Sequence, residues 1–213
     1  NRGFKEATGK YLMLLDSDDY LCQNSIKKCV EFLDFNPSYY LVRTNGCYVK
    51  EGEYDKDLWL FEYDAEKKSK TKLFADLLYG DAYMWAGTYL VRMDILNKLY
   101  PSHEIYPARD GQNLQFTLMP AYYGKAGYID EILMKYTIRK ESLSKSSSGN
   151  MMMKEIKNME AYKEIRFHLI DEFLDNNEGR IWHDRLEVLY LKKYLSIACK
   201  YNSKKLVQKY YHQ

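Results

Sequence analysis

Three carboxylates stand within four positions at the end of an apolar run. Residues 11–21 read YLMLLDSDDYL, so Asp16, Asp18 and Asp19 follow the apolar residues 11–15 directly. In an extended backbone, side chains two positions apart point to the same side, which would bring Asp16 and Asp18 together. Mg²⁺ and Mn²⁺ prefer such oxygen ligands, and substrate phosphates commonly complete the ligand shell. The stretch therefore predicts a metal site that attracts a nucleotide diphosphate; a helix cap and a solvated turn are the alternative.

Two other chemistries use carboxylates in this kind of setting. A calcium EF-hand is excluded because the twelfth position counted from Asp16 is Lys27, where a bidentate Glu is needed. A phosphohydrolase that attacks with the first Asp of an Asp-x-Asp pair remains open. That chemistry needs a Lys and an acidic pair downstream, and YGDAYMWAG is a poor candidate for them.

The surrounding pattern indicates alternating strands and helices. The continuous apolar run at 11–15 is typical of a strand covered on both faces in a mostly parallel sheet. A helix is expected from Asn24, a plausible N-cap, to the Asn36–Pro37 pair. Residues 39–50 read as extended, EGEYDKD as a turn and LWLFEYD as a partner strand. Carboxylates after the first strand would thus lie where open sheets bind ligands.

Further along the chain the elements shorten and then become helical. We expect short helices at 72–79 and 93–99, a helix running through Tyr123, and extended pieces at 127–130 and 133–139. The Ser-rich segment KESLSKSSSGN reads as a hinge, lid or linker, and helical spacing returns at 151–174 and 180–199. Two parts are therefore predicted, an α/β domain over 1–148 and a helical C-terminal extension over 149–213.

The stretch NRGFKEATGKYLMLLDSDDYL resembles the middle of the family 2 glycosyltransferases, in which a helix, a tight Gly turn, a buried strand and an Asp-x-Asp motif follow in this order. The resemblance implies a GT-A-like fold, a Rossmann-like mixed sheet flanked by helices. It also implies that Asp16 and Asp18, with Asp19 beside them, hold Mn²⁺ or Mg²⁺ against the donor diphosphate. The first βα units of that fold have no counterpart here, so we expect an N-terminally truncated domain.

A second landmark of that family is similar to residues 111–144. Tyr136, Arg139, Ser142 and Ser144 fit its Tyr-x-x-Arg-x-x-Ser-x-Ser ending. Arg139 could pair with a diphosphate oxygen, or lie on the surface as an Arg at a strand end usually does.

The start of this landmark departs from the usual pattern. Gln112 and Asn113 stand where Glu and the catalytic Asp are usual, a Gly-Gln-Asn variant that resembles capsular and surface polysaccharide enzymes. Because a neutral amide cannot act as a base, Asp110 becomes the candidate base, with Gln112 and Asn113 orienting the acceptor. A helix-capping role for Asp110 stays equally open.

Trp85 and Gly87 fall where the family places acceptor-site residues. The ring of Trp85 could stack on a sugar, and ordinary packing is the alternative. The acceptor would be a glycan or a lipid-linked glycan. The Lys- and Tyr-rich C-terminal helices could rest on an anionic membrane surface, although solvated helices packed on the domain are preferred.

Composition narrows the setting. In 213 residues, 32 Lys and Arg nearly balance 30 Asp and Glu, which gives no support to nucleic-acid binding. The four cysteines lack Cys-x-x-Cys spacing, no apolar stretch is long enough for a membrane span, and residues 1–10 lack the apolar core that a signal peptide requires. We therefore expect a cytoplasmic protein, for which peripheral contact with the inner face of the membrane stays open. The resemblance to the family 2 glycosyltransferases implies inverting sugar transfer from a nucleotide-diphosphate sugar to a hydroxyl; a non-catalytic glycan-binding remnant is the alternative.

Overall fold

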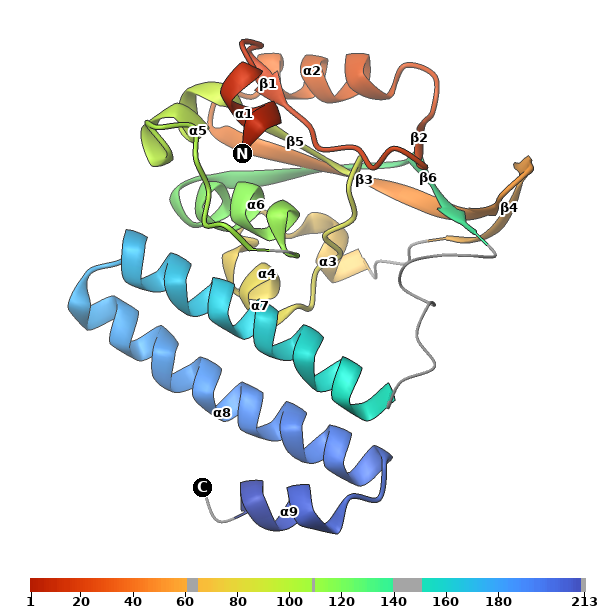
Figure 1. Cartoon of the computed structure of the whole chain (residues 1–213). Coiled ribbons are helices and arrows are strands. Elements are labelled where there is room, and N and C mark those ends of the chain that lie inside the picture. The colour runs from red at the N-terminus through yellow and green to blue at the C-terminus, as the bar shows by residue number, and fades with distance from the viewer. Residues whose placement is uncertain (61–64, 109, 140–150, 212–213) are drawn as a thin grey trace. The chain divides into compact units, whose positions relative to one another are not determined.

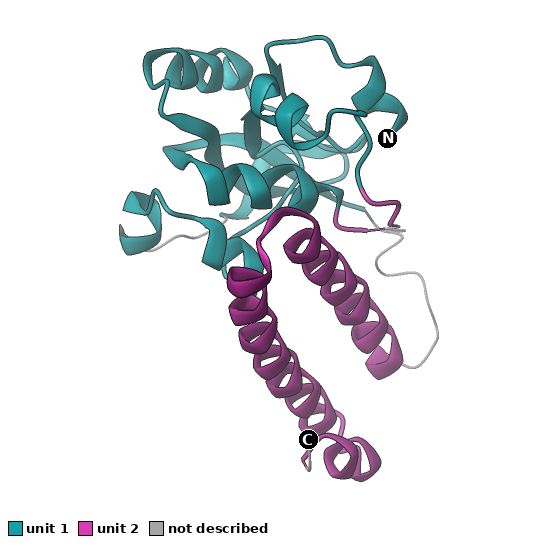
Figure 2. Ribbon diagram, turned by 90° about the vertical axis from the view of Figure 1, so that its left-hand side faces the viewer, with its two compact units in different colours: residues 1–105, 112–146 teal, residues 106–111, 147–213 magenta. Residues whose placement is uncertain are grey.

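The computed structural model of the chain describes residues 1–60, 65–108, 110–139 and 151–211. These residues form two compact units (Figure 2). Unit 1 comprises residues 1–105 and 112–146, and unit 2 comprises residues 106–111 and 147–213. The predicted boundary at 148 falls in a range outside the described residues. The assignment of residues 106–111 to the helical unit has no counterpart in the sequence prediction.

Unit 1 is built on a mixed β-sheet. The described residues contain the strands β1 (Tyr11–Leu12), β2 (Tyr20–Leu21), β3 (Tyr39–Lys50), β4 (Glu53–Leu60), β5 (Tyr89–Arg92) and β6 (Lys125–Ile138). They pair in the order β1-β5-β3-β6-β2, and β4 also pairs with β3. Only the pairing of β3 with β6 is parallel among these described strands. The predicted mixed sheet is confirmed.

The prediction for the first strand was wrong. A buried strand over 11–15 in a mostly parallel sheet was expected, but β1 covers two residues, is half-buried and pairs antiparallel with β5 at the end of the sheet. Leu15 is 45% exposed. An apolar run alone does not distinguish a central strand from an edge strand that continues into a loop. The carboxylates therefore follow an irregular segment rather than the end of a parallel strand.

Helices cover both faces of the sheet. Unit 1 contains α1 (Arg2–Glu6), α2 (Ser25–Phe35), α3 (Ala65–Ser69), α4 (Phe74–Tyr79), α5 (Met93–Leu99) and α6 (Gln112–Tyr123). Figure 1 shows α2 on one face of the sheet and α6 on the other. The apolar residues of α2 recur at helical spacing, so Cys29 and Leu33 are buried against Val42 of β3 and Leu133 of β6. The predicted helices at 24–36, 72–79 and 93–99 are confirmed to within two residues.

Two strands differ from their predicted limits. The turn between β3 and β4 is only Glu51–Gly52, where Gly52 has a φ of +84°, so β4 begins five residues before the predicted partner strand. The two predicted extended pieces after residue 126 form one strand, β6, which shifts register against β3 between Thr44 and Gly46. Polar residues at this irregularity interrupt the strand pattern, which is why the sequence predicted two extended pieces.

Unit 2 consists of α7 (Met151–Phe173), α8 (Asn176–Lys200) and α9 (Lys204–Tyr211), with the segment 106–111. The buried Arg166 of α7 donates through Nη1 to the hydroxyl of Tyr190 of α8, at 2.8 Å. Asp175 caps α8 by accepting from the backbone N–H groups of Asn177 and Glu178. In the part of the chain that the structure describes, no helix has the length and apolarity that a bilayer crossing requires.

Candidate active site

The three carboxylates lie in one turn between β1 and β2. We call residues 16–19 the carboxylate turn. The backbone N–H of Asp19 donates to the carbonyl of Asp16 at 3.1 Å, which closes the turn. Asp16 is exposed, Asp18 is partly buried and Asp19 is buried. Loss of hydration and the charge of Asp18 raise the pKa of Asp16, so these two carboxyl groups are close in space. The extended backbone assumed from the sequence is replaced by a turn, which nevertheless brings Asp16 and Asp18 together.

Asp19 anchors the turn to the end of β6. Its Oδ1 accepts from the backbone N–H of Thr137 at 2.9 Å, while Oδ2 is buried without a hydrogen-bond partner among the described residues. Burial raises the pKa of Asp19 to about 6; the Thr137 hydrogen bond and Arg139 oppose the shift, and Asp18 and Asp16 add to it. Because burial disfavours the charge of Asp19 and the Thr137 N–H holds its Oδ1, this carboxyl group acts as a structural anchor of the turn.

Asp19 should make the stability of unit 1 depend on pH. Its pKa of about 6 in the folded chain lies above the ordinary 3.8, so ionisation disfavours the fold and stability rises as the pH falls through 6. Between pH 8 and pH 5, urea unfolding in EDTA should show the wild type gaining about 1 kcal/mol relative to Asp19→Asn. A difference between the two proteins that is constant with pH would contradict a raised pKa.

Arg139 lies over the carboxylate turn. Its Nε is 3.2 Å from Oδ2 of Asp18 and 3.9 Å from Oε1 of Glu51, contacts that make ion pairs without a hydrogen bond of good geometry. The side chain is 43% exposed, so these contacts are screened by water. The guanidinium is therefore within reach of an anion bound at the turn. Ser142 and Ser144, which complete the expected sequence ending, lie outside the described residues.

The donor set at the turn suits a divalent cation shared with a ligand. Among the described residues, no group of three or more His, Cys, Asp and Glu side chains converges to hold a metal. Asp16 and Asp18 are nevertheless close and accessible, and one or two carboxylates with substrate phosphates are a common Mg²⁺ arrangement. The residues present thus fit a metal that arrives with a diphosphate better than one bound by protein alone.

Aromatic side chains adjoin the carboxylate turn. Trp85 packs against Tyr136 with ring centroids 4.9 Å apart and against Tyr48 at 5.7 Å. Burial raises the pKa of Tyr136, and the charges of Asp19, Asp18 and Asp16 raise it further, so the phenol lies near these carboxylates. Sequence reasoning found Trp85 and Tyr136 but missed Tyr48 and the Thr137 backbone. Only the pairing of β3 with β6, a long-range contact, places those two residues here.

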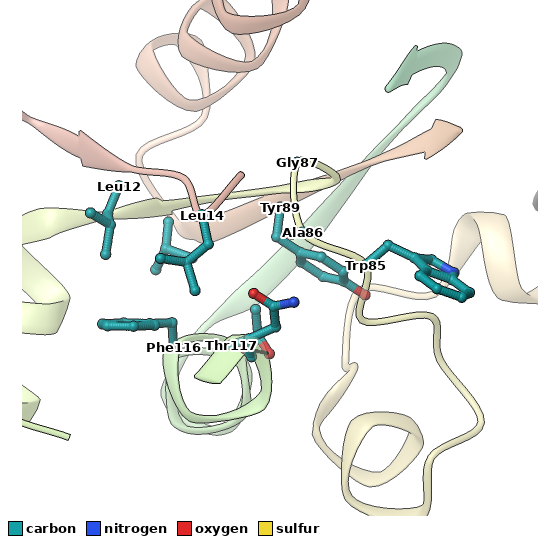
Figure 3. A pocket seen from close by; sticks show the side chains of 10 residues that line it. Leu12, Leu14, Trp85, Ala86, Gly87, Tyr89, Phe116 and Thr117 are labelled. Carbon is teal, nitrogen blue, oxygen red and sulfur yellow. Dashed lines mark hydrogen bonds between the residues drawn. The ribbon is translucent and has the colours of Figure 1, made fainter. Parts of the chain in front are cut away.

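Trp85 also lines a small cavity of about 20 Å³, large enough for about one water molecule. Figure 3 shows its walls: Leu12 and Leu14, the segment from Trp85 to Gly87, and Phe116 and Thr117 of α6. Asn113 also lines it and donates through Nδ2 to the carbonyl of Met84, at 3.0 Å. Three predicted site residues, Trp85, Gly87 and Asn113, are thus brought together.

Gly87 has a structural reason to be glycine. Its φ is +80°, its N–H donates to the carbonyl of Leu14, and a Cβ would lie 2.9 Å from Met134 and 3.0 Å from Leu15. The close approach of two backbones therefore explains the residue without an acceptor. Its acceptor role stays a prediction.

The polar residues at the start of α6 divide between the two units. Gln112 is exposed and begins α6, whereas Asp110 is exposed and belongs to the segment 106–111 of unit 2. Gly111 between them has a φ of +79°, and a Cβ there would lie 2.6 Å from Cδ1 of Ile165. Because α6 begins at Gln112, its N-cap position is Gly111 and not Asp110. The position of Asp110, one residue before the N-cap, therefore argues against the capping explanation.

The chain is similar to a known protein family over its N-terminal part. Residues 1–100 match the family described as glycosyl transferase family 2. This match confirms the resemblance to the family 2 glycosyltransferases inferred from the sequence. No match was found among proteins with curated descriptions.

Solved structures of the same fold include two of TarS from S. aureus. The crystal structure of TarS residues 1–349 in complex with UDP-GlcNAc is 17% identical, with a TM-score of 0.59; the match covers 99% of this chain and 57% of that one. The crystal structure of TarS residues 1–349 is 18% identical, with a TM-score of 0.52, over 92% of this chain and 50% of that one. The chain thus spans about half the length of the solved structures that it matches.

Proposed function

We propose that this chain acts in the transfer of a sugar from a nucleotide-diphosphate sugar to a hydroxyl acceptor, in the synthesis of a surface or capsular polysaccharide. The observation that carries the proposal is the carboxylate turn, in which Asp16 and Asp18 are close and accessible while Asp19 fixes the backbone to β6. The family match over residues 1–100 favours this chemistry over attack by an Asp nucleophile on a phosphate.

Asp16 and Asp18 would hold Mn²⁺ or Mg²⁺, which when bound neutralises charge on the leaving diphosphate. Arg139, now paired with Asp18, would turn its guanidinium to a diphosphate oxygen, since a forked set of donors suits phosphate. Loss of that pairing would leave Asp18 free for the cation. Asp19 would keep the turn in place through Thr137.

The acceptor hydroxyl needs a base and an orienting surface. Asp110 would take the hydroxyl proton as the acceptor oxygen attacks the anomeric carbon with inversion, while Gln112 and Asn113 would orient the acceptor. A carboxylate is the natural choice because the two amides cannot accept a proton at neutral pH. Trp85 would present its ring to the acceptor sugar.

Thermal unfolding with Mn²⁺ and nucleotide diphosphates tests the donor half of this proposal. UDP is the first choice, because TarS was crystallised with UDP-GlcNAc; GDP, ADP and CDP extend the panel. A ligand at one hundred times its dissociation constant should stabilise the chain by about 2.7 kcal/mol. The increase should require metal and nucleotide together, and should disappear in Asp18→Ala.

Asp55→Ala is the matched control, since Asp55 is an exposed carboxylate in β4 and is not part of the carboxylate turn. It should leave the increase unchanged. Stabilisation that persists in Asp18→Ala would place the nucleotide elsewhere. No stabilisation by any nucleotide, combined with binding of a glycan, would favour a non-catalytic glycan-binding protein.

A further inference from the structure

A row of aromatic side chains leads away from the carboxylate turn across three strands. Tyr136 of β6 stands opposite Tyr48 of β3 in the parallel register, and Tyr48 stands opposite Trp59 of β4 in the antiparallel register. The ring centroids are 5.4 Å apart for Tyr136 and Tyr48, and 5.0 Å apart for Tyr48 and Trp59. We call Tyr136, Tyr48 and Trp59 the aromatic row. It lies entirely within unit 1.

A β-bulge places Trp59 in this row. Asp57 is opposite Val49, while Trp59 is opposite Tyr48, so one strand advances by two residues and the other by one. In a regular strand Asp57 and Trp59 would share a face. Leu58 is the extra residue, and it turns Trp59 to the face opposite that of Asp57. Bulges commonly re-aim side chains in this way near functional sites.

The opposite face of the same strands has a different character. There Asp57 pairs with Lys135 at 3.0 Å, and Leu60 is opposite Cys47. The bulge therefore separates an ionic and aliphatic face from an aromatic one. Trp59 is 55% exposed, which leaves a large ring available to a ligand at the far end of the row.

Polar groups accompany the rings along the row. Tyr136 lies beside the carboxylate turn, since the charges of Asp19, Asp18 and Asp16 act on its phenol. Burial raises the pKa of Tyr48, and the phenols of Tyr136 and Tyr83 add to the shift, so three phenolic groups gather in this region. A sugar ring combines apolar C–H faces with a rim of hydroxyls. Ring faces bordered by phenolic and carboxylate groups match that chemistry.

We propose that Trp59 and Tyr48 form a binding subsite for the sugar rings of an acceptor carbohydrate chain, continuous with the carboxylate turn. The inference rests on the proposed sugar transfer and adds to it residues that act at a distance from the reacting hydroxyl. Tyr136 and Trp85 border the reacting end, Tyr48 forms the middle, and Trp59 receives a unit further along the acceptor. A row of this kind makes affinity increase with acceptor length.

The experiment is binding of the chain to a printed array of oligosaccharides that covers hexoses, N-acetylhexosamines, deoxyhexoses and uronic acids, one to eight units long. The wild type should bind at least one series, with longer members bound more tightly. Trp59→Ala should weaken that binding about tenfold or more, and Trp59→Tyr should retain most of it. Leu60→Ala is the matched control: Leu60 is 45% exposed on the opposite face and should have no effect.

Three results would overturn the inference: no glycan bound by the wild type, equal binding by Trp59→Ala, or equal losses in Trp59→Ala and Leu60→Ala. Sedimentation of the same proteins tests the competing possibility. A dimer that Trp59→Ala converts to a monomer would make the row a protein–protein contact instead. The nucleotide-dependent stabilisation described above should be unchanged in Trp59→Ala, so failure of donor binding and failure of glycan binding are separable.

Discussion

Replacement of Asp110 by Asn is expected to lower turnover of the nucleotide sugar by about 10² to 10⁴, the usual contribution of a general base. Asn preserves the size of the side chain but cannot accept the acceptor proton. Asp110 is exposed, and Gly111 after it is held against Ile165 in a conformation that favours glycine. The side chain can therefore be changed without disturbing a buried contact. Initial rates with a saturating donor measure the effect.

Asp110→Ser separates the base from a capping role. Serine is among the best helix caps, so a capping function would survive this change while a base would not. Nucleotide-dependent thermal stabilisation should be retained in both variants, because the proposed donor ligands are Asp16 and Asp18. Turnover that survives in either variant at the wild-type level would remove Asp110 from the reaction and leave the base to another group.

Gly127→Val is expected to destabilise unit 1 by about 3 kcal/mol, the upper part of the usual range for overpacking a core. Gly127 lies in β6 opposite Val42 of β3, and a Cβ at this position would overlap the ring of Phe32. That ring packs edge-on against Tyr39 at 5.4 Å and against the core beneath α2. Displacing it would disturb the contact of α2 with the sheet. Urea unfolding measures the change.

The double variant Phe32→Ala with Gly127→Val identifies the cause. Removing the ring should relieve the overlap, so the double variant should be more stable than the sum of the two single effects implies. Gly3→Val is the surface control, because a Cβ at Gly3 meets nothing within 4 Å. It should change the free energy of unfolding by less than about 0.5 kcal/mol. Strict additivity of the first two changes would rule out the Phe32 contact.

The sequence predicted helices with a regular apolar repeat more accurately than it predicted the first strand. Helix α2 was predicted at its observed position because its apolar residues repeat at helical spacing and Asn36–Pro37 ends it. The prediction for the strand before the carboxylates was wrong in length, burial and pairing. Residues 11–15 are apolar for two different structural reasons, which the sequence pattern does not separate. Tyr11 and Leu12 pair at the end of the sheet, whereas Leu14, which lies in no strand, lines the cavity together with Leu12 and Trp85.

The candidate site shows the same division. Local spacing was enough to predict that Asp16 and Asp18 lie close together. They do so in the structure, although a turn replaces the extended backbone. Thr137, Tyr48 and Trp59 carry no local signal, since strand pairing and a bulge between distant segments place them. The roles of Asp110, Gln112, Asn113, Trp85 and Gly87 stay predictions, and so does contact of the C-terminal helices with a membrane.

The anchor of Asp19 to Thr137 also bears on when the site can form during synthesis. The two residues are 118 positions apart, so the carboxylate turn leaves the ribosome long before the strand that holds it. At about 5 to 20 residues per second, the delay is about 6 to 24 seconds. Until β6 has formed, strand β2, which follows the three carboxylates, lacks the strand with which it pairs. The nascent chain should therefore acquire the nucleotide affinity proposed for it only as β6, the last of the described strands, is added.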